Sequence, residues 1–302
     1  MQAMILAAGL GSRLRPLTSH LPKPLFPVLN TPSVRRILDG LKAAGFKKIV
    51  INACHLTNLL IGAISGWNLG QEIVIVKEPF LLGTGGALKN AMPCLEDGPI
   101  LLINSDVVTD IDLKAVFEAH CQKHPIATMV LHDHPTFNSI KVTGRRVSNF
   151  SFKGRGALAF TGISVIESAL IRSMPDHFPS SLIDTLSDAI GAGEDIIALM
   201  ADELKPGYLW EDIGSVRGYL AAHEALLKKK GWTVFAGADS NLQPDTSIDG
   251  WCVMGDGVKV GRGVTLSRSV IWDGCAIEDG EYIKDSIVTP YGRLGLNNGP
   301  FA

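Results

Sequence analysis

The residues best equipped for chemistry lie near the N-terminus, in the stretch 6–18 and the tripeptide 22–24. Gly9 and Gly11 interrupt an apolar run there, and the missing Cβ atoms let backbone N–H groups turn toward an anion. The cationic side chains of this region follow the glycines, and they are Arg13, Arg15 and Lys23. A short apolar strand, a glycine turn and clustered cations suit a phosphate group, so the region predicts a phosphate-binding loop.

The stretch does not match the two commonest phosphate-binding motifs. It lacks the Gly-Lys-Ser/Thr ending of the common phosphate loop, and the Gly-x-Gly-x-x-Gly spacing of dinucleotide-binding loops fails at Leu14. The string Leu-Ala-Ala-Gly-Leu-Gly-Ser-Arg-Leu-Arg-Pro-Leu-Thr, followed by Pro-Lys-Pro, resembles the signature of sugar-1-phosphate nucleotidyltransferases, the NDP-sugar pyrophosphorylases. The resemblance implies that the loop binds the nucleotide through Ala8, Gly9, Gly11 and Ser12.

The resemblance also implies the reaction. An NTP and a sugar 1-phosphate would give an NDP-sugar and pyrophosphate, because the sugar phosphate oxygen attacks the α-phosphorus in line. Such a reaction mainly requires that two anions are brought together and their charge is neutralised. By resemblance, Arg13 grips the leaving phosphates and Lys23 lies near the α-phosphate. Prolines on both sides of Lys23 hold its backbone extended.

Two aspartates are the predicted Mg²⁺ ligands. Asp106 follows an apolar strand predicted at 99–104, and Asp212 lies in Trp-Glu-Asp-Ile-Gly, which resembles the family's Trp-x-Asp-Val/Ile-Gly. Mg²⁺ is commonly held by one or two carboxylates together with substrate phosphates and water. Because the aspartates lie far apart in the sequence, only the fold can bring them to one ion.

The base and sugar pockets rest on shorter motifs. The run Gly83, Thr84, Gly85 and Gly86 resembles the family loop that packs on the nucleobase, although it also suits a helix-entry turn with Thr84 as the cap. Phe-Thr-Gly at 160–162 resembles a strand beside the sugar, which makes Gly162 a predicted substrate contact. Asn104 and Glu167 are further predicted sugar contacts.

The chain departs from the family pattern at the sugar phosphate. Many members carry Glu-Lys-Pro, whose lysine binds that phosphate, and the triplet does not occur here. Lys153 is the nearest substitute and a predicted substrate contact.

The predicted activity is closest to that of mannose- or heptose-1-phosphate guanylyltransferases. Three alternatives stay open: a uridylyltransferase for glucose or N-acetylated sugar 1-phosphates, a phosphocholine-type cytidylyltransferase, and a regulatory subunit that binds sugar nucleotides without turnover. The last should have lost a catalytic residue, whereas Arg13, Lys23, Asp106 and Asp212 are all present.

Composition excludes several other classes of protein. The 302-residue chain has a formal net charge of −2, so no electrostatic case exists for a nucleic-acid partner. No apolar run is long enough for a membrane helix, and the N-terminus does not resemble a signal peptide. The five cysteines form no Cys-x-x-Cys pair, which is typical of reduced thiols in a cytoplasmic protein.

Apolar strands that alternate with helices over residues 3–131 predict a doubly wound, mixed, Rossmann-like sheet. Short strands over 137–166 suggest an antiparallel lobe beside it. We expect a nucleotidyltransferase domain at 1–235 and a repeat tail at 236–302.

The tail carries a hexapeptide repeat. β-Branched residues recur at Val258, Val264 and Val270, and after a one-residue shift at Ile277 and Ile283. This spacing, with glycines at the corners, predicts a short left-handed parallel β-helix. No histidine follows His223 to serve as a base for acyl transfer, so we expect a structural tail that also supports a homo-oligomer.

Overall fold

The structure, a computed structural model, describes residues 1–296 and forms two compact units. The first unit comprises Met1–Gly9 and Ile37–Trp210, and the second comprises Leu10–Arg36 and the chain from Glu211 onward. The second unit therefore joins most of the signature stretch to the C-terminal repeats. The predicted boundary near residue 235 separates the signature stretch from the repeats, whereas this unit contains both. The boundary stays a prediction.

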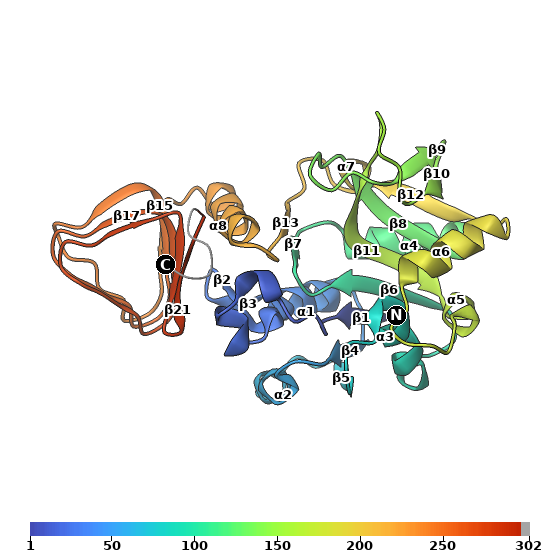
Figure 1. The fold of residues 1–302 in the computed structure, drawn as a ribbon, viewed down its shortest axis with the longest axis horizontal. Helices are drawn as coiled ribbons and strands as arrows, with labels where there is room; N and C mark the ends of the chain where they lie inside the picture. The colour runs from blue at the N-terminus through green and yellow to red at the C-terminus, as the bar shows by residue number, and fades with distance from the viewer. Residues whose placement is uncertain (297–302) are drawn as a thin grey trace. The chain divides into compact units, whose positions relative to one another are not determined.

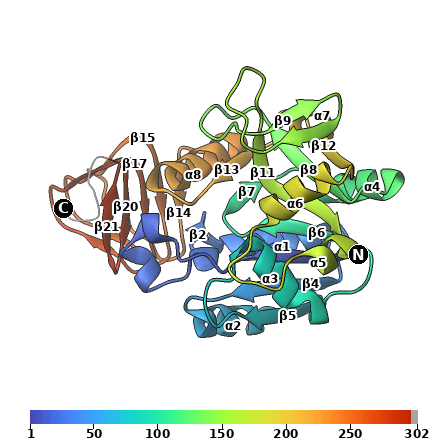
Figure 2. The same cartoon turned by 45° about the vertical axis from the view of Figure 1, so that its right-hand side comes forward.

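A nine-stranded mixed sheet forms the centre of the first unit (Figures 1 and 2). Its spatial order is β5 (Glu72–Lys77), β4 (Lys48–Ala53), β1 (Gln2–Leu6), β6 (Pro99–Asn104), β11 (Ala159–Glu167), β8 (Ala127–His132), β12 (Ile196–Met200), β10 (Arg146–Asn149) and β9 (Lys141–Thr143). The strands β5, β4, β1 and β6 are parallel. Strand β8 is buried along its whole length, as expected for a sheet covered on both faces. The predicted mixed, doubly wound fold is confirmed.

Strand β11 corrects the expectation of a separate antiparallel lobe. It lies inside the main sheet between β6 and β8 and runs antiparallel to both. Seven of its nine residues are buried, so it needs cover on both faces, which only a central position provides. Its pairing with β8 shifts register between Phe160 and Ser164. This irregularity falls in the predicted sugar-side motif.

The helices of the first unit follow the predicted alternation. They are α2 (Thr57–Ser65), α3 (Gly83–Ala91), η4 (Met92–Cys94), α4 (Leu113–Lys123), α5 (Ser168–Ser173), α6 (Leu182–Gly191) and α7 (Ala201–Leu204), with strand β7 (Val107–Thr109) after β6. Helix α1 (Ser33–Ala43) and strand β13 (Trp210–Asp212) run across the unit boundaries. Asp112 caps α4 by accepting the N–H of Ala115 at 3.0 Å. Among residues 1–296, no helix combines the length and hydropathy that a membrane crossing requires.

The second unit contains the signature turns and the coils. Its elements are η1 (Ser12–Leu14), η2 (Leu17–Ser19), η3 (Lys23–Leu25), β2 (Pro27–Val28), β3 (Thr31–Pro32), α8 (Val216–Lys230), β14 (Val234–Ala236), β15 (Ser247–Met254), β16 (Lys259–Val260), β17 (Thr265–Ile271), β18 (Ala276–Ile277), β19 (Tyr282–Lys284), β20 (Ser286–Thr289) and β21 (Gly292–Gly295). Helix α8 ends at Gly231, which adopts the left-handed conformation that suits a helix stop.

The hexapeptide repeat produces parallel coils. Ser247 pairs with Thr265, and Thr265 pairs with Tyr282, which are steps of 18 and 17 residues. Three faces of about six residues account for one such coil. The second step is one residue shorter, so Ile277 pairs with Val260 and Ile283 pairs with Leu266, and not with the ladder residues Val258 and Val264. All five β-branched residues of the ladder are buried. The parallel β-helix architecture of the tail is thereby confirmed.

Candidate active site

The carboxyl edge of the central sheet brings three predicted residues together. Leu6 at the end of β1 pairs with Asn104 at the end of β6, and the N–H of Ser105 donates to the carbonyl of Leu6 at 3.0 Å. Asp106 occupies the next turn. Because β11 is antiparallel, its first residues lie at this same edge. A Cβ on Gly162 would lie 2.9 Å from Nδ2 of Asn104, so only glycine lets the two segments meet.

Glu167 lies apart from this group. It ends β11 and pairs with Pro99, the first residue of β6. Five residues of strand separate it from Gly162, or about 17 Å at 3.3 Å per residue. Its Oε1 instead lies 3.1 Å from Nε2 of the buried His120. Glu167 is therefore not part of the candidate site, and the physical reason is the antiparallel direction of β11.

The glycine run at residues 83–86 opens helix α3, and its glycines have a packing role. A Cβ on Gly83, whose φ is +75°, would lie 2.3 Å from the carbonyl oxygen of Ser180, and one on Gly85 would lie 3.0 Å from Oγ of Ser180. Oγ1 of Thr84 accepts the N–H of Leu182 at 2.9 Å, so it caps α6 rather than α3. The run therefore holds α3 and α6 together, whatever ligand it also contacts.

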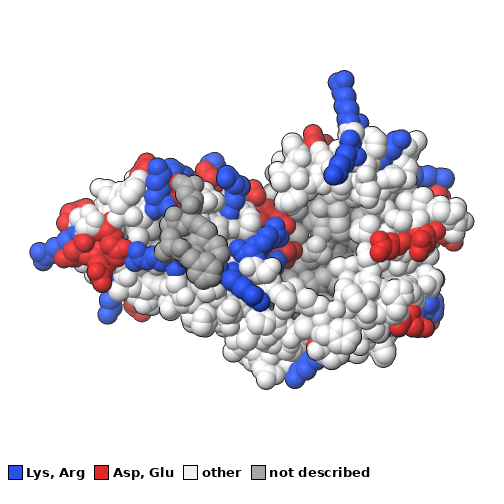
Figure 3. Space-filling model, viewed as in Figure 1, with Lys and Arg blue, Asp and Glu red and all other residues white. Residues whose placement is uncertain are grey.

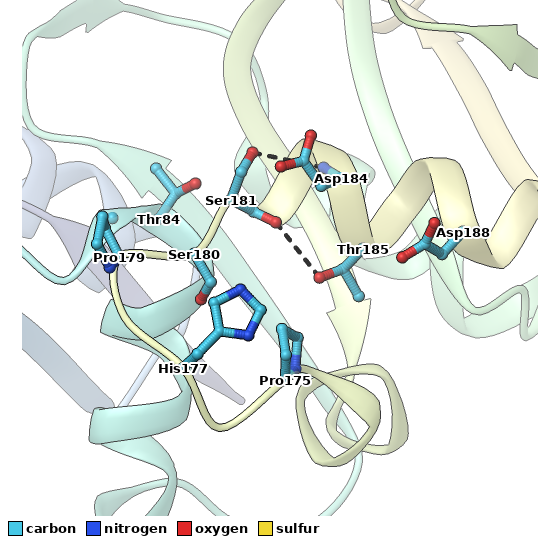
Figure 4. Close-up of a pocket in the computed structure, with 10 residues that line it drawn as sticks. Thr84, Pro175, His177, Pro179, Ser180, Ser181, Asp184, Thr185 and Asp188 are labelled. Carbon is cyan, nitrogen blue, oxygen red and sulfur yellow. Dashed lines mark hydrogen bonds between the residues drawn. The ribbon is translucent and has the colours of Figure 1, made fainter.

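A hollow of about 530 Å³ lies beside this run (Figure 4). Its lining comprises Gly83, Thr84, Pro175, His177, Pro179, Ser180, Ser181, Asp184, Thr185 and Asp188. Hydroxyl groups and two carboxylates dominate the lining, and it contains no lysine or arginine. The hollow therefore suits a neutral, hydroxyl-bearing group better than a phosphate.

A buried polar chain links the signature strand to the glycine run. The N–H of Ala7 donates to Oδ1 of Asn52 at 2.8 Å, and Nδ2 of Asn52 donates to Oε1 of Glu78 at 2.7 Å. Oε2 of Glu78 accepts the N–H of Leu82 at 3.2 Å. Sequence reasoning missed Asn52 and Glu78, although Asn52 interrupts the apolar run of β4 and Glu78 directly follows β5, which were usable signals. The chain fixes two predicted nucleotide-binding segments relative to each other.

Trp210 of the Trp-Glu-Asp motif anchors the sugar-side strand. Its Nε1 donates to the carbonyl of Thr161 at 2.7 Å, and its ring packs edge-on against His132 at 4.4 Å and His134 at 5.5 Å. Burial lowers the pKa of His132 to about 4, so its imidazole is neutral at pH 7. Its Nδ1 lies 3.1 Å from Oη of Tyr208. The histidines at the end of β8 are a second set that sequence reasoning missed.

In the second unit, Arg13 and Asp212 meet at Gly214. A Cβ on Gly214 would lie 2.5 Å from Nη2 of Arg13 and 2.6 Å from Oδ1 of Asp212. The N–H of Gly214 also donates to Oδ1 of Asp212. Glycine follows the motif because both functional side chains occupy the space that a side chain would need.

Gly11 plays a similar part at Thr18, next to Lys23. It has a φ of +62°, and a Cβ there would lie 2.7 Å from Cγ2 of Thr18 and 3.7 Å from Cβ of Lys23. Oγ1 of Thr18 donates to the carbonyl of Gly11 at 3.0 Å. The signature loop and the Pro-Lys-Pro segment are therefore packed together, and the structure brings Arg13, Lys23 and Asp212 into one compact unit.

Lys153 lies on an exposed loop beside a second hollow of about 570 Å³ in the first unit. Arg155 lines the same hollow and adds a second cation that sequence reasoning did not single out. Asp133 also lines it, and its Oδ1 accepts a hydrogen bond from Nδ2 of Asn138 at 2.7 Å. The loop can therefore offer two cations to an anionic group.

The carboxylates suit a magnesium ion. Asp106 and Asp212 present the oxygen ligands that Mg²⁺ prefers, and the ion usually takes only one or two from protein, with substrate phosphates completing its shell. Within residues 1–296, no three carboxylate, imidazole or thiol groups gather as a protein-only metal cluster. A site completed by substrate fits this donor set.

Comparison with known proteins identifies the family. A model of the nucleotidyl transferase family matches residues 2–229. The chain belongs to the nucleotidyl transferase family. It is 29% identical to mannose-1-phosphate guanylyltransferase 1 of Arabidopsis thaliana over an alignment of 325 positions, which covers 98% of this chain and 88% of that protein. It is 33% identical to N-acetylmuramate alpha-1-phosphate uridylyltransferase of Neisseria meningitidis serogroup B over an alignment of 223 positions, which covers 72% of this chain and 94% of that one.

The fold is also found among solved structures. The crystal structure of HddC from Yersinia pseudotuberculosis complexed with GMP-PN aligns with a TM-score of 0.63 at 23% identity, covering 74% of this chain and 99% of that one. This nucleotidyl transferase therefore shares the fold of that structure.

Proposed function

We propose that this chain transfers a nucleotidyl group from an NTP to a sugar 1-phosphate and releases pyrophosphate. The observation that carries the proposal is the meeting of Arg13 and Asp212 at Gly214, with Lys23 packed on the same loop. A cation for the leaving phosphates, a cation for the reacting phosphate and a carboxylate for a metal ion are what in-line nucleotidyl transfer needs. The curated relatives named above act on sugar phosphates, which supports this substrate class.

Each cation has a proposed task. The planar guanidinium of Arg13 binds two phosphate oxygens at once and stabilises the charge that develops on leaving pyrophosphate. The point charge of Lys23 neutralises the α-phosphate and the attacking sugar phosphate, which otherwise repel each other. Their effect is largest in the transition state, where negative charge moves toward the leaving group.

Asp106 and Asp212 would hold Mg²⁺ in this scheme. The ion supplies charge neutralisation on the phosphate oxygens when bound. Asp106 directly follows the turn residue after β6, Asp212 ends β13, and each is proposed as a ligand of the ion. Asp212 keeps its orientation through the N–H of Gly214.

On the acceptor side, Asn104 and Gly162, which pack against each other at the sheet edge, are proposed to contact the sugar. Lys153 is proposed to bind the sugar phosphate in place of the missing Glu-Lys-Pro lysine, with Arg155 as a second cation on its loop. On the nucleotide side, Ala8, Gly9, Gly11 and Ser12 are proposed to contact the phosphates, and the run at 83–86 is proposed to contact the base.

The preferred base is proposed to be guanine, as in the mannose-1-phosphate guanylyltransferase that matches nearly the whole chain. Uracil is the second candidate, because the relative with the higher identity is a uridylyltransferase. Both options keep the same four catalytic residues.

A pyrophosphate-release screen tests the proposal. GTP, UTP, CTP, ATP and dTTP are each paired with the 1-phosphates of mannose, glucose, N-acetylglucosamine and N-acetylmuramate, with Mg²⁺ present. One pair should give sustained release that is absent from an Arg13→Ala preparation purified in parallel. Binding of nucleotide and sugar phosphate by calorimetry, with no release from any pair, would overturn catalysis and indicate the regulatory alternative.

A further inference from the structure

The coiled tail contacts the catalytic stretch at three places within the second unit. The rings of His20 and Tyr291 stack 4.6 Å apart with an angle of 6° between their planes. Nδ2 of Asn30 donates to Oδ1 of Asp256 at 2.9 Å. Between these two places, the ring of Phe26 meets the ring of Trp272. The tail therefore holds the stretch that carries Lys23 from both ends and from the middle.

The middle contact is a fully buried aromatic cluster. The ring of Phe26 lies edge-on to that of Trp272, with centroids 4.8 Å apart, and edge-on to that of Tyr219, with centroids 6.0 Å apart. Phe26 and Tyr219 are completely inaccessible to solvent, and Trp272 is 5% exposed. Figures 1 and 2 both show α8, which carries Tyr219, beside the coils. Edge-on pairs of this kind add about 0.5–1.5 kcal/mol each beyond the burial of area.

A directed chain of hydrogen bonds runs through this cluster. Nε1 of Trp272 donates to Oη of Tyr219 at 3.0 Å, and the hydroxyl of Tyr219 donates to the carbonyl of Pro27. Burial raises the pKa of Tyr219, so the hydroxyl keeps its proton and its direction at any working pH. The indole N–H of Trp272 in the tail is thereby connected, through the Tyr219 hydroxyl, to the carbonyl of Pro27, which lies four residues after Lys23.

The backbone around Lys23 transmits this restraint. Residues 23–25 form a 3₁₀ turn, which corrects the extended backbone expected for Lys23 from its flanking prolines. The N–H of Phe26 donates to the carbonyl of Lys23 at 3.0 Å in this turn. Oγ and the N–H of Ser33 donate to the carbonyls of Pro24 and Phe26. Prolines at 22 and 24 remove most of the remaining freedom. The hydrogen bond to the Pro27 carbonyl therefore restrains the position of the Lys23 Cα, from which the lysine side chain extends.

We infer that Tyr219 and Trp272 are positioning residues for Lys23, so that the β-helix tail sets the rate of nucleotidyl transfer without touching substrate. This inference rests on the proposed function of Lys23. Misplacement of a reacting group by about 1 Å can reduce a rate by roughly 100-fold, so loss of one buried hydrogen bond can matter at this distance.

Tyr219→Phe and Trp272→Phe test the inference, because each removes one donor and keeps an aromatic ring. The matched control is Ile283→Val, a buried side chain of the coils. Steady-state kinetics should show kcat reduced about 10-fold in each aromatic variant, with a smaller change in KM for either substrate, while the control keeps its kcat at a similar loss of melting temperature. The double variant should lose little more than Tyr219→Phe alone, since both act through Pro27.

Amide hydrogen exchange gives a readout that does not depend on turnover. Protection of the Leu25 and Phe26 amides should fall in both aromatic variants and stay unchanged in Ile283→Val. Unchanged kcat and protection, or losses that the control shares at equal stability, would overturn the inference. A wild-type protein that is inactive with every substrate pair, yet shows the exchange effect, would instead contradict the proposed function and leave the structural coupling standing.

Discussion

At the residue scale, the charge of Asp106 and Asp212 is the feature most directly tied to the proposed chemistry. Asn at either position keeps the shape of the side chain and removes its charge, so Mg²⁺ and its phosphates lose a ligand. We expect kcat to fall by about 100- to 1,000-fold in Asp106→Asn and Asp212→Asn, with unchanged circular dichroism. Asp176→Asn, an exposed carboxylate paired with Lys89, is the control. Near-normal kcat at saturating Mg²⁺ would contradict the assignment.

The two signature cations lead to a second prediction at this scale. Because Arg13 and Lys23 are proposed to act on the transition state, Arg13→Ala and Lys23→Ala should lower kcat and kcat/KM together, by about 100-fold. Kinetics in both directions provide the measurement, and Arg146→Ala, an exposed partner of Asp195, provides the control. A rise in the KM for NTP alone would show that the side chains bind the ground state equally well.

At the element scale, the two glycines of the signature loop should respond differently to a methyl group. No atom lies within 4 Å of a Cβ built on Gly9, whereas Gly11 has a positive φ and Thr18 at 2.7 Å. Gly11→Ala should therefore cost about 1–3 kcal/mol of stability. Gly9→Ala should keep the wild-type melting temperature and raise the KM for NTP, because the open space is where phosphate is expected. Equal melting temperatures in both variants would contradict the loop conformation.

At the scale of the whole molecule, buried histidines predict how stability depends on pH. Burial lowers the pKa values of His132 and His223 to about 4, below the ordinary 6.5. As pH falls below about 6.5, these histidines are protonated in the unfolded chain but not in the folded chain. The free energy of unfolding therefore has its full value at neutral pH and declines toward pH 4. Each histidine should cost roughly 1–2 kcal/mol between pH 7 and pH 5. Urea unfolding at both pH values measures this, and His223→Gln should show a smaller decline than the wild type.

The assembly of the molecule gives a further prediction. Tyr282 on β19 is 59% exposed, and within residues 1–296 no strand pairs with the outer edge of β19. An open edge with an exposed aromatic residue favours contact with a second copy of the chain, so we expect a homo-oligomer. Light scattering after gel filtration should show a lower mass for Tyr282→Lys than for the wild type, and an unchanged mass for Trp232→Lys. A monomeric wild type at micromolar concentration would contradict this expectation.

The charge distribution of the whole molecule agrees with small anionic substrates rather than a polyanion. Figure 3 shows both basic and acidic side chains on the face that it presents. The formal net charge of −2 gives no overall attraction for a polyanion. Anions are therefore expected to bind at particular residues such as Arg13, and not along an extended surface.

The sequence by itself determined the features that depend on neighbours in the chain. The alternation of apolar strands and helices, the cap at Asp112 and the spacing of the β-helix ladder are local patterns, and each corresponds to an observed element. The signature string identified the family for the same reason, because glycine turns and clustered cations act within one loop. The candidate residues Arg13, Lys23, Asp106 and Asp212 came from such strings.

Only the tertiary structure decided what depends on residues far apart in the sequence. The insertion of β11 between β6 and β8 placed Gly162 against Asn104 and carried Glu167 to the opposite edge, which the strand pattern could not reveal because it does not encode direction. The buried link from Asn52 to Glu78 and the link from Trp272 through Tyr219 to Pro27 are likewise invisible in a linear reading. Their donors and acceptors are separated by 26, 53 and 192 residues, and only folding brings such groups within hydrogen-bonding distance.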